Sequence, residues 1–269
     1  MTTGETTDDR FLQALLARFQ RVDVLAEHTM TNSVHWRVAP GSALAGDDVK
    51  TDPHQLSHSA HHALVVAIDH LQALAALVRG TEKDGVREMQ LHSYAPFTLL
   101  RAALENAARA VWLLGPAARR ERVHRCLTMH LADLASMEKK AKLVQAPLDV
   151  YPERNERILN LLRGAGVPES ELVKKKLRMP DWATVVADAG DLAKVENAVL
   201  LWSLCSALAH GDLGGTLTVL DRDLMATNGD VSWARVSASP ERVLTATSAA
   251  LVMAEYAFNL YAVRARAPY

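Results

Sequence analysis

The chain has 269 residues, of which 49% are hydrophobic, 23% charged and 5% aromatic, and its formal net charge at pH 7 is -1. This composition is typical of a globular protein and excludes a fibrous or an intrinsically disordered chain. The balanced charge argues against general binding to nucleic acid, which usually requires an excess of lysine and arginine, and leaves open a local basic patch.

The cysteines and the N-terminus indicate a cytoplasmic protein. Cys126 and Cys205 lie far apart within apolar helical patterns, so we expect two reduced thiols in the core. The first residues, MTTGETTDDR, show neither the basic nor the apolar region of a secretory signal. The apolar stretch 244–263 contains Glu255, which favours a buried helix of a soluble protein over a membrane span.

Hydrophobic periodicity predicts an all-α fold, a helical bundle of five to seven helices with a small β-hairpin near 216–236. We expect a single domain over residues 9–266 after a disordered tail, 1–8, with a long loop over 28–52. Glycine and proline stop signals place the helices at about 9–27, 52–78, 88–114, 117–144, 152–163, 194–209 and 239–264, with a short one opening at Pro180. The helix over 194–209 is apolar almost all round, which predicts a buried central helix.

The predicted helix over 88–114 carries a charged pair on its apolar face. Arg101 and Glu105 are four residues apart and share a stripe with Tyr94, Phe97, Ala108 and Trp112, whereas Asn106 and Arg109 fall off this stripe. Because long charged side chains are rarely buried without a partner, the pair indicates either a structural ion pair or a ligand-binding or catalytic site.

Two other helices carry polar stripes. Glu196, Ser203, Ser206 and His210 line up on the otherwise apolar helix 194–209, where buried hydroxyls and an imidazole would need partners. The last helix offers Thr245, Ser248, Glu255, Tyr256 and Asn259, which face either the same interior site or solvent.

The second predicted helix is rich in histidine. His54, His58, His61 and His62 resemble a zinc or nickel site, but their stripe is the polar one, so we favour a solvated face over a metal site. His70 instead falls on the apolar side, where a hydrogen-bonded core histidine is the simpler interpretation, and His130 on the fourth helix is interpreted in the same way.

Short motifs resemble a known superfamily. The segments Leu100-Arg-Ala-Ala-Leu-Glu105-Asn-Ala and Trp202-Ser-Leu-Cys-Ser206-Ala-Leu-Ala-His210-Gly, with Asp69-His70-Leu71, are similar to a group of all-helical bacterial proteins related to the HEPN superfamily. The resemblance extends from about residue 52 to 220. It implies a metal-independent endoribonuclease of a stress or phage-defence system, working without a cofactor and often as a homodimer.

The resemblance assigns roles to residues of this chain, and one motif departs from it. Arg101, Glu105 and His210 are expected to be catalytic, with Asp69, His70, Ser203 and Ser206 as binding residues and RNA as the partner. HEPN nucleases carry an arginine that is separated from the histidine by four to six residues, whereas the corresponding positions before His210 are Cys205, Leu204 and Ser203. Arg101 from the neighbouring helix is the substitute that we predict.

Two alternatives stay open at this stage. The string from Arg125 to His130 has HEPN spacing, but only His130 lies on an apolar face, so we interpret it as a chance match. In the other alternative the polar residues form a structural network in a non-catalytic binding or interaction module. A shared site requires Arg101 and His210 to lie within about 10 Å of each other, since otherwise they cannot reach one phosphate.

Overall fold

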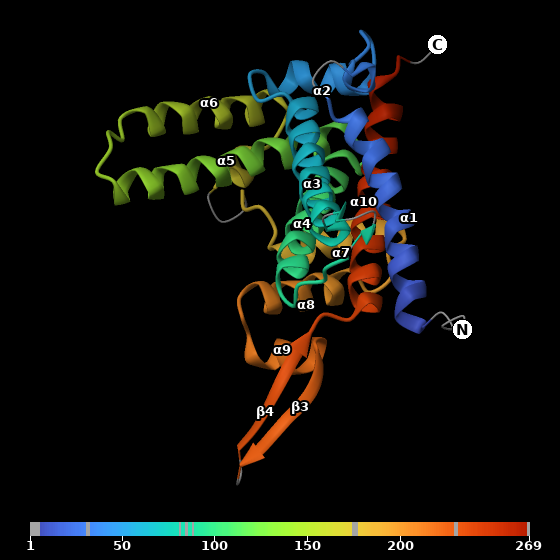
Figure 1. Ribbon diagram of the computed structural model, residues 1–269. Coiled ribbons are helices and arrows are strands. Elements are labelled where there is room, and N and C mark those ends of the chain that lie inside the picture. The colour runs from blue at the N-terminus through green and yellow to red at the C-terminus, as the bar shows by residue number, and fades with distance from the viewer. Residues whose placement is uncertain are drawn as a thin grey trace.

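The computed structural model describes residues 6–30, 33–80, 82–83, 86–87, 89–173, 177–228 and 231–267 (Figure 1). The described chain is mostly helical, and the prediction of a helical protein with a small β-hairpin is confirmed. Its α-helices are α1 (Thr7–His28), α2 (Ala43–Thr51), α3 (Leu56–Arg79), α4 (Ala95–Leu114), α5 (Arg119–Leu143), α6 (Val150–Gly164), α7 (Trp182–Ala193), α8 (Ala198–Ala209), α9 (Leu213–Val219) and α10 (Pro240–Ala265). Short 3-10 turns occur at Val34–Trp36 and Glu169–Glu171. Strands β1 (Glu82–Lys83) and β2 (Val86–Arg87) pair antiparallel, as do β3 (Asp221–Asn228) and β4 (Val231–Ser237).

The main core lies between four long helices, α1, α3, α4 and α10, which run side by side in Figure 1. The central one is α4, because 12 of its 20 residues are buried. Small side chains such as Ala103, Ala107 and Ala110 line its buried faces. They allow the backbones of α3 and α10 to approach closely while Leu100 and Leu104 fill the space between them.

The prediction of a buried central helix over 194–209 is wrong. Helix α8 lies across one end of α4, and only Ala198, Cys205 and Leu208 of α8 are buried (Figure 1). It also begins four residues late, because Lys194 and Asn197 adopt left-handed backbone conformations that separate it from α7. The apolar composition of α8 therefore does not mean that other helices cover it on every side.

The hairpin begins later than predicted. Residues 216–219 belong to α9, whose N-cap is Asp212; the side chain of Asp212 accepts a hydrogen bond from the backbone N–H of Gly215. The alternation at 216–220 suits a strand, but a capped helical turn forms there instead. In the hairpin Asp223 pairs with Arg235, and both strands extend away from the helices (Figure 1). Part of the predicted turn, residues 229–230, lies outside the described residues.

The predicted loop over 28–52 contains helix α2. Ser42 caps it by accepting a hydrogen bond from the backbone N–H of Ala45. The carboxylate of Asp47 is fully buried and accepts hydrogen bonds from Arg119 and Arg122 of α5 at 2.7 to 3.1 Å. Glycine and aspartate at 46–48 are typical of loops, and the partner that stabilises the helix lies some 70 residues away, so this helix had no local signal.

Helix starts differ elsewhere for local reasons. Helix α1 begins at Thr7, within the predicted tail, because Thr6 and Asp9 form a capping box; residues 1–5 lie outside the described part. Helix α3 begins at Leu56 rather than near 52. Helix α4 begins at Ala95 rather than near 88, because Pro96 fits only the first turn of a helix.

Helices α5 and α6 form a pair that projects from the main core (Figure 1). Their contact buries a second apolar cluster made of Val123, Leu127, Ile158, Leu162, Val167 and Leu177. Cys126 on α5 and Cys205 on α8 are free and buried, as predicted, and burial raises the pKa of each thiol to about 12.

Two helices of the described residues, α3 and α10, are long and apolar enough to cross a membrane by length and composition. Both are packed within the main core, where about half of each apolar stretch is buried. Core helices commonly show the same composition, so this property does not distinguish a membrane span from a core helix.

Candidate functional site

Helices α4 and α8 bring the predicted pair of Arg101 and His210 into direct contact. The distance between Nη1 of Arg101 and Nε2 of His210 is 3.1 Å, although 109 residues separate them in the sequence. Because a guanidinium only donates, Nε2 of His210 is the acceptor in this hydrogen bond. The distance requirement for a shared site is therefore met.

Glu105 holds the arginine in place. Its Oε1 atom accepts a hydrogen bond from Nε of Arg101 at 3.0 Å and another from the indole Nε1 of Trp202 at 2.8 Å. The side chains of Arg101 and Glu105 are 27% and 16% exposed, so the pair is half-buried rather than enclosed in the core. One carboxylate thus fixes a side chain of α4 and a side chain of α8 together.

The turn after α8 places His210. Gly211 has φ +70°, a conformation that side chains disfavour, and it lets the chain turn from α8 into α9. Gly215 on α9 lies close against α8, since a Cβ atom there would come within 2.7 Å of the Cβ of Ala207. The imidazole of His210 is left exposed at the end of α8.

Two contacts attach α9 and the hairpin to the start of α4. The hydroxyls of Tyr94 and Thr216 are 3.5 Å apart, and Ser93 donates a hydrogen bond to the carbonyl of Val236 at 3.0 Å. The N-terminal end of α4 is therefore connected to α9 and to the base of the hairpin, while Arg101 further along α4 contacts His210.

The four predicted binding residues lie apart from this contact. Asp69 and Ser203 are exposed and Ser206 is half-buried, and within the described residues none of their side chains bonds to Arg101 or His210; only the backbone carbonyl of Ser206 accepts the N–H of His210, at 3.1 Å. His70 is half-buried, and its Nδ1 atom lies 2.7 Å from the carbonyl of Val66, one turn earlier. That contact is local to α3, which fits the simpler interpretation of a hydrogen-bonded histidine.

The stripes on the other helices also differ from expectation. The polar stripe predicted over 194–209 is mostly exposed: Glu196, which precedes α8, and Ser203 are exposed, and Ser206 is half-buried. On α10 Ser248 accepts a hydrogen bond from Arg18, and Glu255 pairs with Arg21. Both partners belong to α1, so this stripe faces α1 and takes no part in the site.

Sequence reasoning missed Arg109, which lies two turns after Arg101 on the same helix. Its guanidinium carbon is 4.9 Å from the centre of the Trp182 ring on α7. Burial lowers the pKa of Arg109, while the carboxylates of Asp133 and Glu105 act in the opposite direction. The sequence did contain a signal, because Arg101, Glu105 and Arg109 follow one another at intervals of four residues. Arg109 was left out because the apolar stripe was defined too narrowly.

The histidine run of α3 splits between several partners. His54, which precedes α3, lies against His130 of α5 in a tilted arrangement with ring centres 4.7 Å apart, and His61 lies tilted against Trp36 at 4.1 Å. His58 and His62 are exposed. Across the residues that the structure describes, no three His, Cys, Asp or Glu side chains are arranged to hold a metal ion.

The string from Arg125 to His130 does not form a pair either. Arg125 donates to the carbonyl of Trp112 and to Glu121. His130 lies 3.0 Å from the hydroxyl of Ser59, and burial lowers its pKa to about 4. The two side chains thus have different partners, as expected for a chance match.

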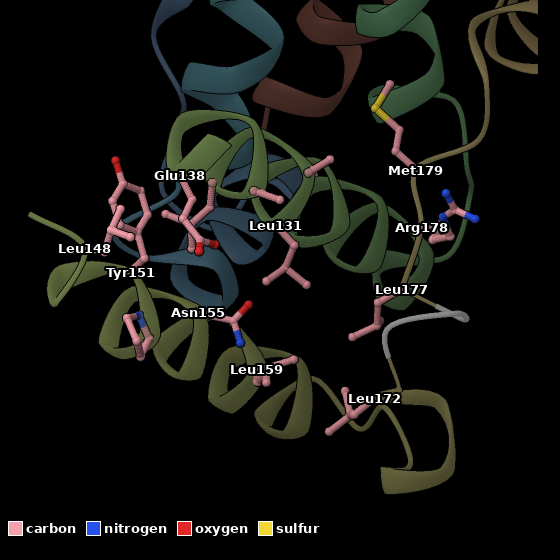
Figure 2. A pocket seen from close by; sticks show the side chains of 14 residues that line it. Leu131, Glu138, Leu148, Tyr151, Asn155, Leu159, Leu172, Leu177, Arg178 and Met179 are labelled. Atoms are coloured by element: carbon pink, nitrogen blue, oxygen red, sulfur yellow. The ribbon is translucent and has the colours of Figure 1, made fainter. Parts of the chain in front are cut away.

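A separate cavity of about 660 Å³ lies between α5 and α6 (Figure 2). Leucines dominate its wall, and Figure 2 shows the amide of Asn155 directed into the space between Leu131 and Leu159. None of Arg101, Glu105 and His210 lines it. This cavity and the polar contact on α4 are therefore different places in the molecule.

Comparisons with protein-family descriptions, with curated proteins and with solved structures found no match to this chain.

Proposed function

We propose that the surface around Arg101 and His210 binds a phosphate of RNA and cleaves the chain without a metal, as an HEPN-like endoribonuclease. The observation that carries the proposal is the 3.1 Å contact between Nη1 of Arg101 and Nε2 of His210, on an exposed edge of the molecule. A fixed cation and an imidazole nitrogen side by side are the two groups that this reaction needs.

The chemistry follows from these two groups. A phosphate that binds Arg101 draws the Nη1 hydrogen bond away from His210 and frees Nε2. That nitrogen then takes the proton of the ribose 2′-hydroxyl, the 2′-oxygen bonds to phosphorus, and the bond from phosphorus to the 5′-oxygen breaks. The leaving 5′-oxygen takes its proton from water or from the protonated His210. The products are a 2′,3′-cyclic phosphate and a 5′-hydroxyl end.

Glu105 is a positioning residue in this proposal. Its hydrogen bond to Nε of Arg101 leaves the opposite edge of the guanidinium directed at His210. Trp202 holds the carboxylate from the other side, and a charge-assisted contact of this kind fixes the direction of the donor. A phosphate can therefore be bound without ordering a flexible arginine first.

The alternative is a binding or interaction module in which the same residues are structural. It is favoured by the observation that Glu105 already neutralises Arg101, so the pair is complete without a ligand. A dimer, a bundle of HEPN type and a cytoplasmic role in stress or phage defence belong to the proposal and await their own tests.

The decisive experiment is cleavage of total RNA and of structured RNAs by the purified chain, with and without EDTA. We expect cutting that resists EDTA, leaves 2′,3′-cyclic phosphates and is lost in both His210→Ala and Arg101→Ala. Arg154→Ala is the matched control, because Arg154 is an exposed arginine on α6, outside the site. Intact RNA with a folded wild-type protein would instead assign the network to the binding module.

A further inference from the structure

Arg109 is a half-buried cation for which the described residues provide no hydrogen-bond acceptor. Within the described part of the chain it donates no hydrogen bond and forms no ion pair, and its Nε atom is buried without an acceptor. Its guanidinium lies over the face of the Trp182 ring. Because a guanidinium carries five donors, this is an unusual arrangement for a half-buried arginine.

The nearby carboxylates form no hydrogen bond with Arg109 within the described residues. Asp133 on α5 and Glu105 on α4 are the acidic groups that act on it, and Glu105 is already bonded to Arg101 and Trp202. Burying a charge without a hydrogen-bonded partner is unfavourable, and contact with an indole face offsets only part of that cost. Such a position is retained more readily when a ligand supplies the missing acceptor.

The position of Arg109 relates it to the proposed nuclease site. It lies eight residues after Arg101 on α4, which corresponds to two turns and about 12 Å along the helix axis. Arg101, Glu105 and Arg109 are all partly exposed, while Ala103, Leu104, Ala107 and Ala108 between them are buried. The two arginines therefore lie on the side of α4 that α7 and α8 partly cover, with Glu105 between them.

We propose that Arg109, backed by Trp182, binds a second phosphate of the RNA strand whose scissile phosphate lies at Arg101 and His210. This inference rests on the proposed function and names its substrate more narrowly, as a single strand that extends along α4. Glu105 repels a phosphate midway between the arginines, so the strand presents its uncharged ribose and base there. A phosphate at Arg109 also supplies the acceptor that this guanidinium lacks.

Binding of uncleavable oligonucleotides tests this inference. The probes are fluorescein-labelled 2′-O-methyl RNAs of two and of eight nucleotides, which lack the attacking hydroxyl, and the readout is fluorescence anisotropy at several salt concentrations. We expect Arg109→Gln to weaken binding of the octamer roughly tenfold and to lower the slope of log affinity against log salt by about 1, as for the loss of one phosphate contact. The dimer, which carries one internal phosphate, should bind both proteins equally.

Two further variants separate the possible results. Arg109→Lys keeps the charge and should retain most of the octamer affinity, which guards against a loss caused by misfolding. Arg154→Gln is the exposed control. Octamer affinity and salt slope unchanged in Arg109→Gln would overturn the inference, and equal weakening for the dimer and the octamer would do the same.

Failure of the inference is distinguishable from failure of the proposed function. If Arg101→Ala abolishes cleavage while Arg109→Gln binds and cleaves like wild type, the nuclease proposal holds and the second phosphate position is wrong. If neither wild type nor any variant cleaves RNA or binds the octamer, both are wrong.

Discussion

At the scale of single residues, Glu105 decides how the site is ordered, because one of its oxygen atoms accepts hydrogen bonds from two helices. In Glu105→Gln the side chain keeps its shape and loses its charge, so Arg101 is held less firmly. We expect the initial rate of RNA cleavage to fall by roughly tenfold to a hundredfold, less than in His210→Ala.

A modest change in stability should accompany the loss of this charge. The half-buried pair predicts a fall of about 1 kcal/mol in the free energy of unfolding, measured with urea. Exposed Glu153, whose partner is Arg157 at 3.6 Å, is the comparison, and Glu153→Gln should leave both rate and stability unchanged. Full cleavage by Glu105→Gln would remove the positioning role.

His130 makes the stability of the protein depend on pH. Burial lowers its pKa from 6.5 to about 4, with a further lowering by His54, whose ring lies against it. The unfolded chain therefore takes up a proton at this position between pH 6.5 and 4, while the folded chain does not. Consequently the free energy of unfolding falls as the pH is lowered through this window and, for this residue, levels off below about pH 4.

Urea unfolding at pH 7 and at pH 4.5 measures this effect. We expect His130→Gln to lose about 2 kcal/mol less than wild type between the two values, after allowance for the partial exposure of the ring. His92→Gln, at an exposed position, should behave like wild type. A pH dependence that is identical in His130→Gln and wild type would show that other groups cause it.

At the scale of elements, the attachment of α2 to α5 depends on a buried ion pair. Asp47 is fully buried, and Arg122, which is almost fully buried, also donates to the carbonyls of Pro116 and Ala117. We expect Asp47→Asn to lower the free energy of unfolding by about 3 to 5 kcal/mol, because it leaves a buried guanidinium without its counter-charge.

The partner variant separates charge from packing. The double variant Asp47→Asn, Arg122→Met removes both charges and should recover part of the loss, as measured by urea unfolding at pH 7. Asp188→Asn on α7 is the exposed control. A double variant that is less stable than Asp47→Asn would mean that Arg122 stabilises the fold chiefly through its carbonyl contacts.

The helices differ in whether nearby sequence signals are enough to predict them. Glycine and proline signals, together with the 3.6-residue period, place α1, α5, α6 and α10 within a few residues, because these helices are ended by chemistry within the sequence itself. Helix α2 has no such signal, since its stability comes from Arg119 and Arg122 far along the chain. Which helix occupies the centre is likewise a tertiary property, so an all-apolar α8 was mistaken for the core element.

In the candidate site, too, local features could be predicted from the sequence and tertiary contacts could not. The i, i+4 spacing predicted the ion pair of Arg101 and Glu105, and the resemblance to HEPN proteins suggested His210 as their partner. The indole of Trp202 and the contact between Arg109 and Trp182 were not predicted, because both depend on how α7 and α8 cross α4. Periodicity assigns a side chain to a face of its own helix and says nothing of which neighbour covers that face.

At the scale of the whole molecule, the main core and the α5–α6 pair are separate apolar clusters. The proposed site lies on the main core, whereas the cavity of Figure 2 lies between α5 and α6. Substitutions inside that cavity therefore act on a different part of the molecule from substitutions around Arg101 on α4.

The position of the hairpin has a mechanical consequence. Strand β3 follows α9 directly, and strand β4 is attached near its end to Ser93, just before α4. The base of the hairpin is therefore fixed at two places, by α9 and by Ser93. Because α9 directly joins the turn at His210 to β3, a displacement of this base would act first on α9 and on that turn.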